Sequence, residues 1–441
     1  MKAASIQMMR GLPARLKTLS ASAFMRNVAM IASGAALAQA LLLLVSPLLT
    51  RLFSPEAFGL LGMFMAVAGI IGPSAALRYE LAIPVARTEL MAGTLLYLCL
   101  IVAAALSALS GVIVILWAED IGALLDAPAL APYLYLLPIH IFAMGAFLAL
   151  SQWAARREHF AVLARNPMTR SVAAIAVQLG AGIAALGQGW LIIGFLAGHV
   201  AAALGLFARL MRREAEALRP PRRLRASLVA AARRFRRFPV FAAPQELLNA
   251  LSQQLPNLVL AAFFGPVVLG LYWLTMRVLQ APAQLIGQSV RQVFYQRICD
   301  LLNRGGSSFS LMAKTTGALA LVGALAFVPV IAFGPMLFAL IFGEEWREAG
   351  EYARWVALWS WVGFANVPAV CGLQAMGAQK GLLVYEIFLF IGRNGALFWF
   401  AFAGEPLEAV IAYALVGAAF NLALIFYGHG YALTKRQISS T

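Results

Sequence analysis

VVLGLYWLTMRVLQAPAQLIGQSVR, residues 267–291, is an apolar stretch long enough to cross a membrane, and a polar stripe runs along it. The polar positions follow the first at spacings of 3, 7, 11 and 14, so an α-helix gathers them on one face: Arg277, Gln280, Gln284, Gln288 and Arg291. A charged side chain at the centre of a membrane helix costs about 2.5–3.5 kcal/mol. This face therefore turns away from lipid, toward a helix-bundle interior or a wet cavity.

The composition of the whole chain is that of a membrane protein. Of its 441 residues 62% are hydrophobic and 12% are charged, whereas a soluble domain carries about 25% charged residues. A spanning helix needs about 20 apolar residues and satisfies its backbone groups internally. The sequence predicts an all-α polytopic membrane protein with twelve spans: 27–50, 57–77, 91–117, 130–152, 168–187, 190–211, 239–264, 267–289, 314–341, 352–374, 382–403 and 407–430.

The basic residues of the chain predict its topology. With a cytoplasmic N-terminus and twelve spans, 29 of the 34 Lys and Arg residues fall in cytoplasmic segments, and both termini lie on that side. The outer side keeps only Arg51, Arg347 and Arg354. The net charge of +16 thus reflects membrane orientation, and nucleic acid is not an expected partner. Four tryptophans near the outer span ends are expected at the membrane interface: Trp117, Trp190, Trp346 and Trp355.

A short repeat divides the chain into two halves. FSPEAFGLL at 53–61 and FGPVVLGLY at 264–272 share Phe, Pro and Gly-Leu at the same spacing, and each joins the first two spans of a six-span set. We expect six-helix bundles in 27–211 and 238–430, a cytoplasmic lead-in in 1–26, a basic linker in 212–237 and a tail in 431–441. Parallel repeats of this kind place a substrate site between the halves.

The linker region 209–237 holds eleven arginines and no lysine. It can serve as a topological anchor on anionic lipid, or as a coupling or docking segment.

Further polar positions lie inside the predicted spans. Glu246, Asn249, Gln253 and Asn257 share a face of span 239–264, and Glu386 and Arg393 share one of span 382–403. Arg277 can contact an anion or pair with Glu246 or Glu386. The two glutamates can in turn titrate and couple transport to protons, or serve as fixed ion-pair partners. His140, His199 and His429 have no metal-spaced companion and are expected to be packing residues.

Several classes of protein are disfavoured. There is no phosphate-cradling P-loop and no acidic cluster for a metal, and the three cysteines have no disulfide or ligand spacing. We therefore expect no enzyme, no cofactor and no metal site.

Three segments resemble the Wzx-type polysaccharide flippases of the multidrug/oligosaccharidyl-lipid/polysaccharide (MOP) exporter superfamily. They are residues 27–59, NVAMIASGAALAQALLLLVSPLLTRLFSPEAFG; residues 78–86, RYELAIPVA; and residues 269–297, LGLYWLTMRVLQAPAQLIGQSVRQVFYQR. The resemblance covers nearly the whole chain in order. It implies two pseudo-symmetric six-helix bundles that face each other in a V around a central cationic cavity.

The resemblance also implies a function. Such a protein flips a polyprenyl-pyrophosphate-linked oligosaccharide from the cytoplasmic to the periplasmic leaflet of a bacterial inner membrane, among membrane lipids and beside polysaccharide polymerase or assembly proteins. Carried onto this sequence, the candidates for the pyrophosphate and acidic sugars are Arg78, Arg277, Arg51 and Arg393. Neutral residues would meet sugar hydroxyls: Asn249, Gln253, Asn257, Gln280 and Gln284. The ion-coupling candidates are Glu246 and Glu386.

Three alternatives stay open at this point. Lipid II flippases share the architecture but commonly have two further spans. Multidrug exporters usually recognise cations with acidic pockets. The third alternative is a non-transporting scaffold in a polymer-assembly complex.

Overall fold

The computed structural model describes residues 14–215, 224–304 and 306–440, without the side chains of 14–28, 224, 435–440 and several positions in 281–292. The start of the predicted lead-in and the centre of the basic linker lie outside these ranges. All regular structure within them is helical, as predicted. The N-terminal half contains α2 (Ala14–Leu52), α3 (Pro55–Ile71), α4 (Glu89–Leu124), α5 (Ala131–Leu134), α6 (Leu137–Arg156), α7 (Phe160–Ile183) and α8 (Trp190–Glu214), followed by α9 (Leu224–Arg234).

The C-terminal half begins with the longest helix of the chain. It contains α10 (Ala243–Asn303), α11 (Ser308–Phe342), α12 (Arg347–Ala365), α13 (Val367–Ala375), α14 (Gln379–Ala403) and α15 (Pro406–Ser440). Within α10 the backbone leaves helical geometry at Gly265, where φ is 74°, a conformation that suits glycine. This break falls between the two spans predicted as 239–264 and 267–289.

Local sequence accounts for several helix starts. The Ser54 side chain accepts a hydrogen bond from the Ala57 backbone N–H, and Pro55 follows as the first residue of α3. The Thr88 side chain accepts in the same way from the Met91 N–H at the start of α4. The sequence repeat thus marks a real turn, because Ser54 and Gly265 occupy corresponding positions before their prolines.

Ten segments of the described chain are long and apolar enough to cross a membrane. One of them, 238–280, includes the break at Gly265, and α7 is not among the ten. The polytopic all-α class is confirmed, while the count of twelve spans stays a prediction. The helix that carries the predicted fifth span, α7, begins at Phe160, ahead of the predicted span start at 168.

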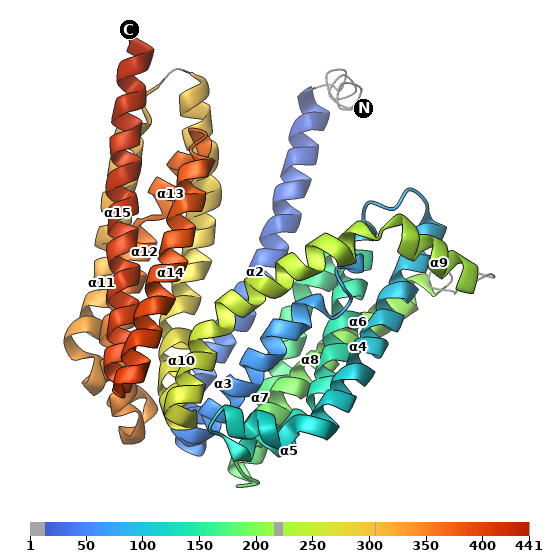
Figure 1. Cartoon of the computed structure of the whole chain (residues 1–441). Helices are drawn as coiled ribbons and strands as arrows, with labels where there is room; N and C mark the ends of the chain where they lie inside the picture. Colours follow the sequence, from blue (N-terminus) through green and yellow to red (C-terminus); the bar gives the residue numbers. More distant parts are fainter. Residues whose placement is uncertain (1–13, 216–223, 305, 441) are drawn as a thin grey trace.

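The helices form a V (Figure 1). The two halves meet at the end away from both termini and diverge toward the termini, with α2 between them. The first part of α10 runs along α3: the Ser74 hydroxyl donates to the Ala243 carbonyl at 3.4 Å, and a β-carbon on Gly69 would lie 3.0 Å from Nε2 of Gln254. The beginning of the C-terminal half therefore packs directly on the N-terminal half.

The two copies of the sequence repeat contact each other where the halves meet. A β-carbon built on Gly59 would overlap the carbonyl oxygen of Pro266, and one built on Gly270 would overlap that of Pro55. The contacts are reciprocal, so each glycine lets the other repeat's proline turn approach backbone to backbone. We call this arrangement of Pro55, Gly59, Pro266 and Gly270 the repeat crossing.

Trp346 lies at the end where the two halves meet, which we call the closed end. Its burial there corrects a prediction. It was expected at the membrane interface, but its side chain is fully buried. Its indole N–H donates to the Thr50 carbonyl at 3.0 Å, and its ring packs edge-on against Phe58, with centroids 5.0 Å apart. The residue belongs to the core because α2, α3 and the turn Glu344–Trp346 converge there, which hydropathy near a span end does not reveal.

Candidate functional site

A cavity of about 1050 Å³ lies between the two halves of the V. Helices of both halves line it: α2, α3, α6, α7 and α8 on one side, and α10, α12, α14 and α15 on the other. Its wall includes three arginines, Arg170, Arg277 and Arg393, and no aspartate or glutamate among the described residues. The cavity is therefore cationic and suited to an anion.

Arg277 sits on the polar stripe of α10 and faces the cavity. One of its terminal nitrogens donates to the Leu42 carbonyl of α2 at 3.3 Å, and its guanidinium carbon lies 5.1 Å from the Trp273 ring centroid. It forms no ion pair in the described part of the chain. The alternative in which Arg277 pairs with Glu246 or Glu386 is wrong for this structure. The Glu246 carboxylate pairs with Arg78 instead, with 3.3 Å between the carboxylate oxygen and a terminal nitrogen of Arg78.

Arg393 of α14 is held between two aromatic rings. Its guanidinium carbon lies 4.0 Å from the Trp359 ring centroid and 3.9 Å from that of Tyr413. Its Nε and one terminal nitrogen are buried without a hydrogen-bond partner among the described residues. A β-carbon at Gly417 would lie 3.2 Å from this Nε, so the glycine makes room for the group. Arg393 also lines the cavity, and a flat, oriented guanidinium is suited to phosphate or carboxylate.

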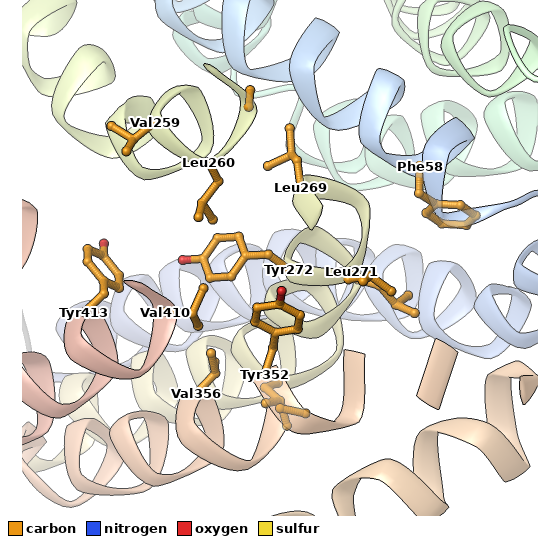
Figure 2. Close-up of a cluster of buried hydrophobic side chains, with 14 of the residues drawn as sticks. Phe58, Val259, Leu260, Leu269, Leu271, Tyr272, Tyr352, Val356, Val410 and Tyr413 are labelled. Carbon is orange, nitrogen blue, oxygen red and sulfur yellow. The ribbon is translucent and has the colours of Figure 1, made fainter. Parts of the chain in front are cut away.

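Buried side chains pack against the aromatic residues that surround Arg393. Figure 2 shows Tyr272 of α10 reaching toward Tyr413 of α15, with Leu260 and Val410 packed beside them. Tyr272 and Val410 are almost fully buried, and both tyrosines also contribute to the cavity wall. The aromatic ring that stacks on Arg393 is thus anchored in the core.

Neutral polar residues supply the rest of the polar wall. Gln280 donates to the Ser360 hydroxyl at 3.2 Å, and Asn257 donates to the Gln254 side-chain oxygen at 2.8 Å. Gln253 also lines the cavity, and its side chain is exposed. These amides keep donors and acceptors available for hydroxyl-rich ligands. The predicted Gln284 lies on α10, but its side chain is outside the described part of the structure.

Five other predicted site residues do not line the cavity: Arg51, Arg78, Glu246, Asn249 and Glu386. Arg78 has a left-handed backbone conformation and pairs with Glu246 and, at 3.6 Å, with the buried Glu80. Arg51 is exposed in the last turn of α2, at the closed end. Asn249 and Glu386 are exposed on α10 and α14. Their predicted roles remain predictions.

The sequence reasoning missed several residues of the cavity wall. Arg170, at the start of the predicted span 168–187, was counted with the cytoplasmic basic residues, but it lies within α7 and lines the cavity. The spacing of Arg170, Ala174 and Gln178 on one helical face was a usable signal. His140 and His199 were expected to be separate packing residues, but their ring centroids are 4.8 Å apart on the cavity wall.

Comparisons with known proteins identify the class and then the family. The solved structures described below, among them MOP-superfamily transporters, share the fold of this chain. Residues 48–351 match the family of polysaccharide biosynthesis proteins, and the chain belongs to that family. This confirms the resemblance to Wzx-type flippases. No curated protein matches the chain.

Three solved structures illustrate the shared fold. An inward-facing multidrug resistance MATE transporter of the MOP superfamily is 16% identical, with 93% of this chain and 96% of that one covered, at a TM-score of 0.61. The lipid II flippase MurJ, in an inward closed conformation, is 12% identical, with coverages of 90% and 87% and a TM-score of 0.67. A MOP transporter from Pyrococcus furiosus, reported with a binding pocket of reverse polarity, is 14% identical, with coverages of 94% and 96% and a TM-score of 0.53. These three solved structures are two transporters and a flippase, and they show that the chain shares their fold.

Proposed function

We propose that this protein flips an anionic, polyprenyl-pyrophosphate-linked oligosaccharide from the cytoplasmic to the periplasmic leaflet by alternating access. The observation that carries the proposal is the cavity between the halves, whose wall has three arginines and no carboxylate among the residues that the structure describes. Pyrophosphate and acidic sugars are the anionic parts of such a cargo. Arg277 and Arg393 would bind them, and Gln253, Asn257 and Gln280 would meet sugar hydroxyls.

The same wall argues against a cation exporter. A cationic drug would need acidic or aromatic partners free of competing positive charge. Here the aromatic faces of Trp359 and Tyr413 are already stacked on Arg393. A second positive charge beside that guanidinium would be repelled.

An apolar crevice supports the lipid-linked part of the proposal. Its volume is about 430 Å³, and it lies where α3 and α4 of one half face α10 and α14 of the other. The residues that line it are apolar, and they include Val67, Leu255, Val259 and Phe398. Leu255 and Val259 lie beside the cavity residues Gln254 and Asn257 on α10. A prenyl chain could therefore lie across this helix while its headgroup occupies the cavity.

The V would correspond to the inward-open state. The halves meet at the repeat crossing and diverge on the side of the termini (Figure 1). The distribution of Lys and Arg predicts that this side is cytoplasmic, and the resemblance to Wzx-type flippases implies a bacterial inner membrane. The cavity would then receive cargo from the cytoplasmic leaflet, where lipid-linked sugars are assembled.

The test is leaflet accessibility of a labelled short-chain polyprenyl-pyrophosphate oligosaccharide in proteoliposomes, with and without a pH gradient. Wild-type protein should transfer the label, Arg277→Ala should abolish transfer, and Arg277→Lys should retain part of it. Arg297→Ala is the matched control, because Arg297 is exposed on the same helix outside the cavity. Equal transfer by Arg277→Ala and Arg297→Ala would remove the site assignment. Transfer of a cationic drug in place of the labelled lipid would refute the proposed cargo.

A further inference from the structure

The function proposed above gives no binding role to a polar cluster on the N-terminal side of the cavity, although Arg170 of this cluster adds to the cavity's charge. Arg170 of α7 is exposed on the cavity wall, where His140 of α6 and His199 of α8 also lie. The two imidazole rings meet edge to face, with centroids 4.8 Å apart and an interplanar angle of 68°. The Arg170 charge acts on His199. Three helices thus bring one guanidinium and two imidazoles together.

Close packing of α7 on α8 holds the cluster. A β-carbon on Gly198 would lie 2.7 Å from the Arg170 carbonyl oxygen and 3.4 Å from its Cγ. The two helices are therefore in contact at this point, and the Arg170 side chain starts beside the residue that precedes His199. The backbone therefore starts the Arg170 side chain on the same side of the cavity as the two imidazoles.

Both histidines retain unused hydrogen-bonding capacity. Nδ1 of His199 lies 3.0 Å from the Phe195 carbonyl oxygen, so this nitrogen carries the hydrogen in the neutral ring and Nε2 is the basic one. His140 is 3% exposed, and its Nδ1 has no hydrogen-bond partner among the described residues. A buried imidazole nitrogen without a partner is unusual in a native structure, and a ligand bound in the adjacent cavity would explain it.

The surroundings of the two rings contain few charges. In the described part of the chain, the charged or titratable groups that act on them are the rings themselves and Arg170. The neighbours of the His140 ring include Phe64 of α3, Phe195 of α8 and Gly72, which follows α3. An anion bound beside two imidazoles favours their protonated form.

We propose that Arg170, His140 and His199 form a second anion subsite, which binds the pyrophosphate of the cargo from the N-terminal half and gains a proton as it does so. The inference rests on the proposed function, because it requires an anionic cargo in the same cavity. Arg277 and Arg393 act on that cargo from the C-terminal half. Cargo binding and proton uptake are then one event, which ties transport to a proton gradient without either predicted glutamate.

The test is calorimetric titration of the purified full chain with farnesyl pyrophosphate, in two buffers of the same near-neutral pH but different ionisation enthalpy. The buffer dependence of the heat reports the protons taken up per ligand. Wild-type protein should take up about one proton, and farnesol, which has no anionic group, should cause no uptake. His199→Gln should remove the uptake, and Arg170→Gln should weaken binding about tenfold, the value expected for one lost charge-assisted hydrogen bond.

His429→Gln is the matched control. His429 of α15 makes the same type of bond as His199, from Nδ1 to the Ile425 carbonyl at 2.7 Å, but it is outside the cavity wall. This variant should keep both uptake and affinity. His199 is only half-buried, so its variant decides the question even if His140→Gln does not fold.

Two results would overturn the subsite and leave the cationic cavity intact. One is binding to wild-type protein without proton uptake, and the other is undiminished uptake by folded His199→Gln. Failure of wild-type protein to bind farnesyl pyrophosphate at all would instead contradict both proposals. The failure of the subsite and the failure of the proposed function are thus distinguishable.

Discussion

Replacing Gly59 and Gly270 by alanine should open the end at which the two halves meet. Each new methyl group would overlap a backbone carbonyl oxygen of the other repeat, that of Pro266 or Pro55. The Gly59 methyl would also lie 2.8 Å from the Pro266 Cα, and the Gly270 methyl would lie 2.9 Å from the Gly59 nitrogen. Backbone atoms cannot rotate aside as a side chain can, so the two segments must move apart.

The cost follows from the nature of the overlap. Inserting a methyl group into close-packed surroundings costs about 1–3 kcal/mol. Alanine is otherwise better than glycine within a helix, by about 0.5–1 kcal/mol, so any loss is steric. The repeat crossing forms only where the two halves meet. The steric cost of the methyl group therefore destabilises mainly the conformation in which this end is closed. A bias of 1–3 kcal/mol changes the ratio of two conformations by a factor of about 5–150.

The assay is the distance between spin labels on two exposed loops at the closed end. The labels are placed at Ala185 and Glu405, in the loops after α7 and α14, in a chain whose native cysteines are replaced. Both alanine variants should shift the distance distribution toward longer separations. Gly395→Ala serves as the control, because nothing lies within 4 Å of a β-carbon there. An unchanged distribution and unchanged melting temperature in both variants would show that the repeat crossing does not hold the halves together.

Three further predictions concern buried charge and the closed end. Arg393→Lys keeps the charge but loses the flat stack on Trp359 and Tyr413. Calorimetry should therefore show at least about tenfold weaker binding of farnesyl pyrophosphate. Equal affinity would refute the role of stacking. Arg78→Ala leaves the buried Glu80 carboxylate without its counter-charge and should cost about 3–5 kcal/mol. Glu246→Gln keeps the Glu80 pair and should lower the melting temperature less; equal losses would contradict this ranking. Trp346→Phe removes the hydrogen bond to the Thr50 carbonyl and should cost about 1 kcal/mol or more in thermal unfolding, and a melting temperature equal to that of wild type would argue against it.

The membrane class and most helix boundaries could be predicted because they depend on local sequence. Length and hydropathy located the apolar segments, and the proline–glycine repeat located the turns at Pro55 and Gly265. The early start of α7 was missed because Arg165 and Arg170 make its first turns look like a cytoplasmic loop. A basic residue inside a span and one beside it look alike until the helix is placed against its neighbours.

Part of the site could also be predicted. The helical spacing on α10 indicated that Arg277 and Gln280 face a cavity, and the structure places both there. The partner of Glu246 could not be predicted, because Arg78 lies 168 positions away and approaches it only through the packing of α3 on α10. The pair of His140 and His199 was hidden for the same reason, since the two residues lie on helices separated by α7.

The sequence alone determined the membrane class, the internal repeat and the polar face of residues 267–291. These features depend on hydropathy, residue spacing and backbone preference within one segment. The tertiary structure alone decided that the two repeats contact each other, that Arg393 lies between two rings, and that Arg170 shares the cavity with a histidine pair. Such contacts join residues of different helices, and the distance between two helices is set by the packing of all their side chains together.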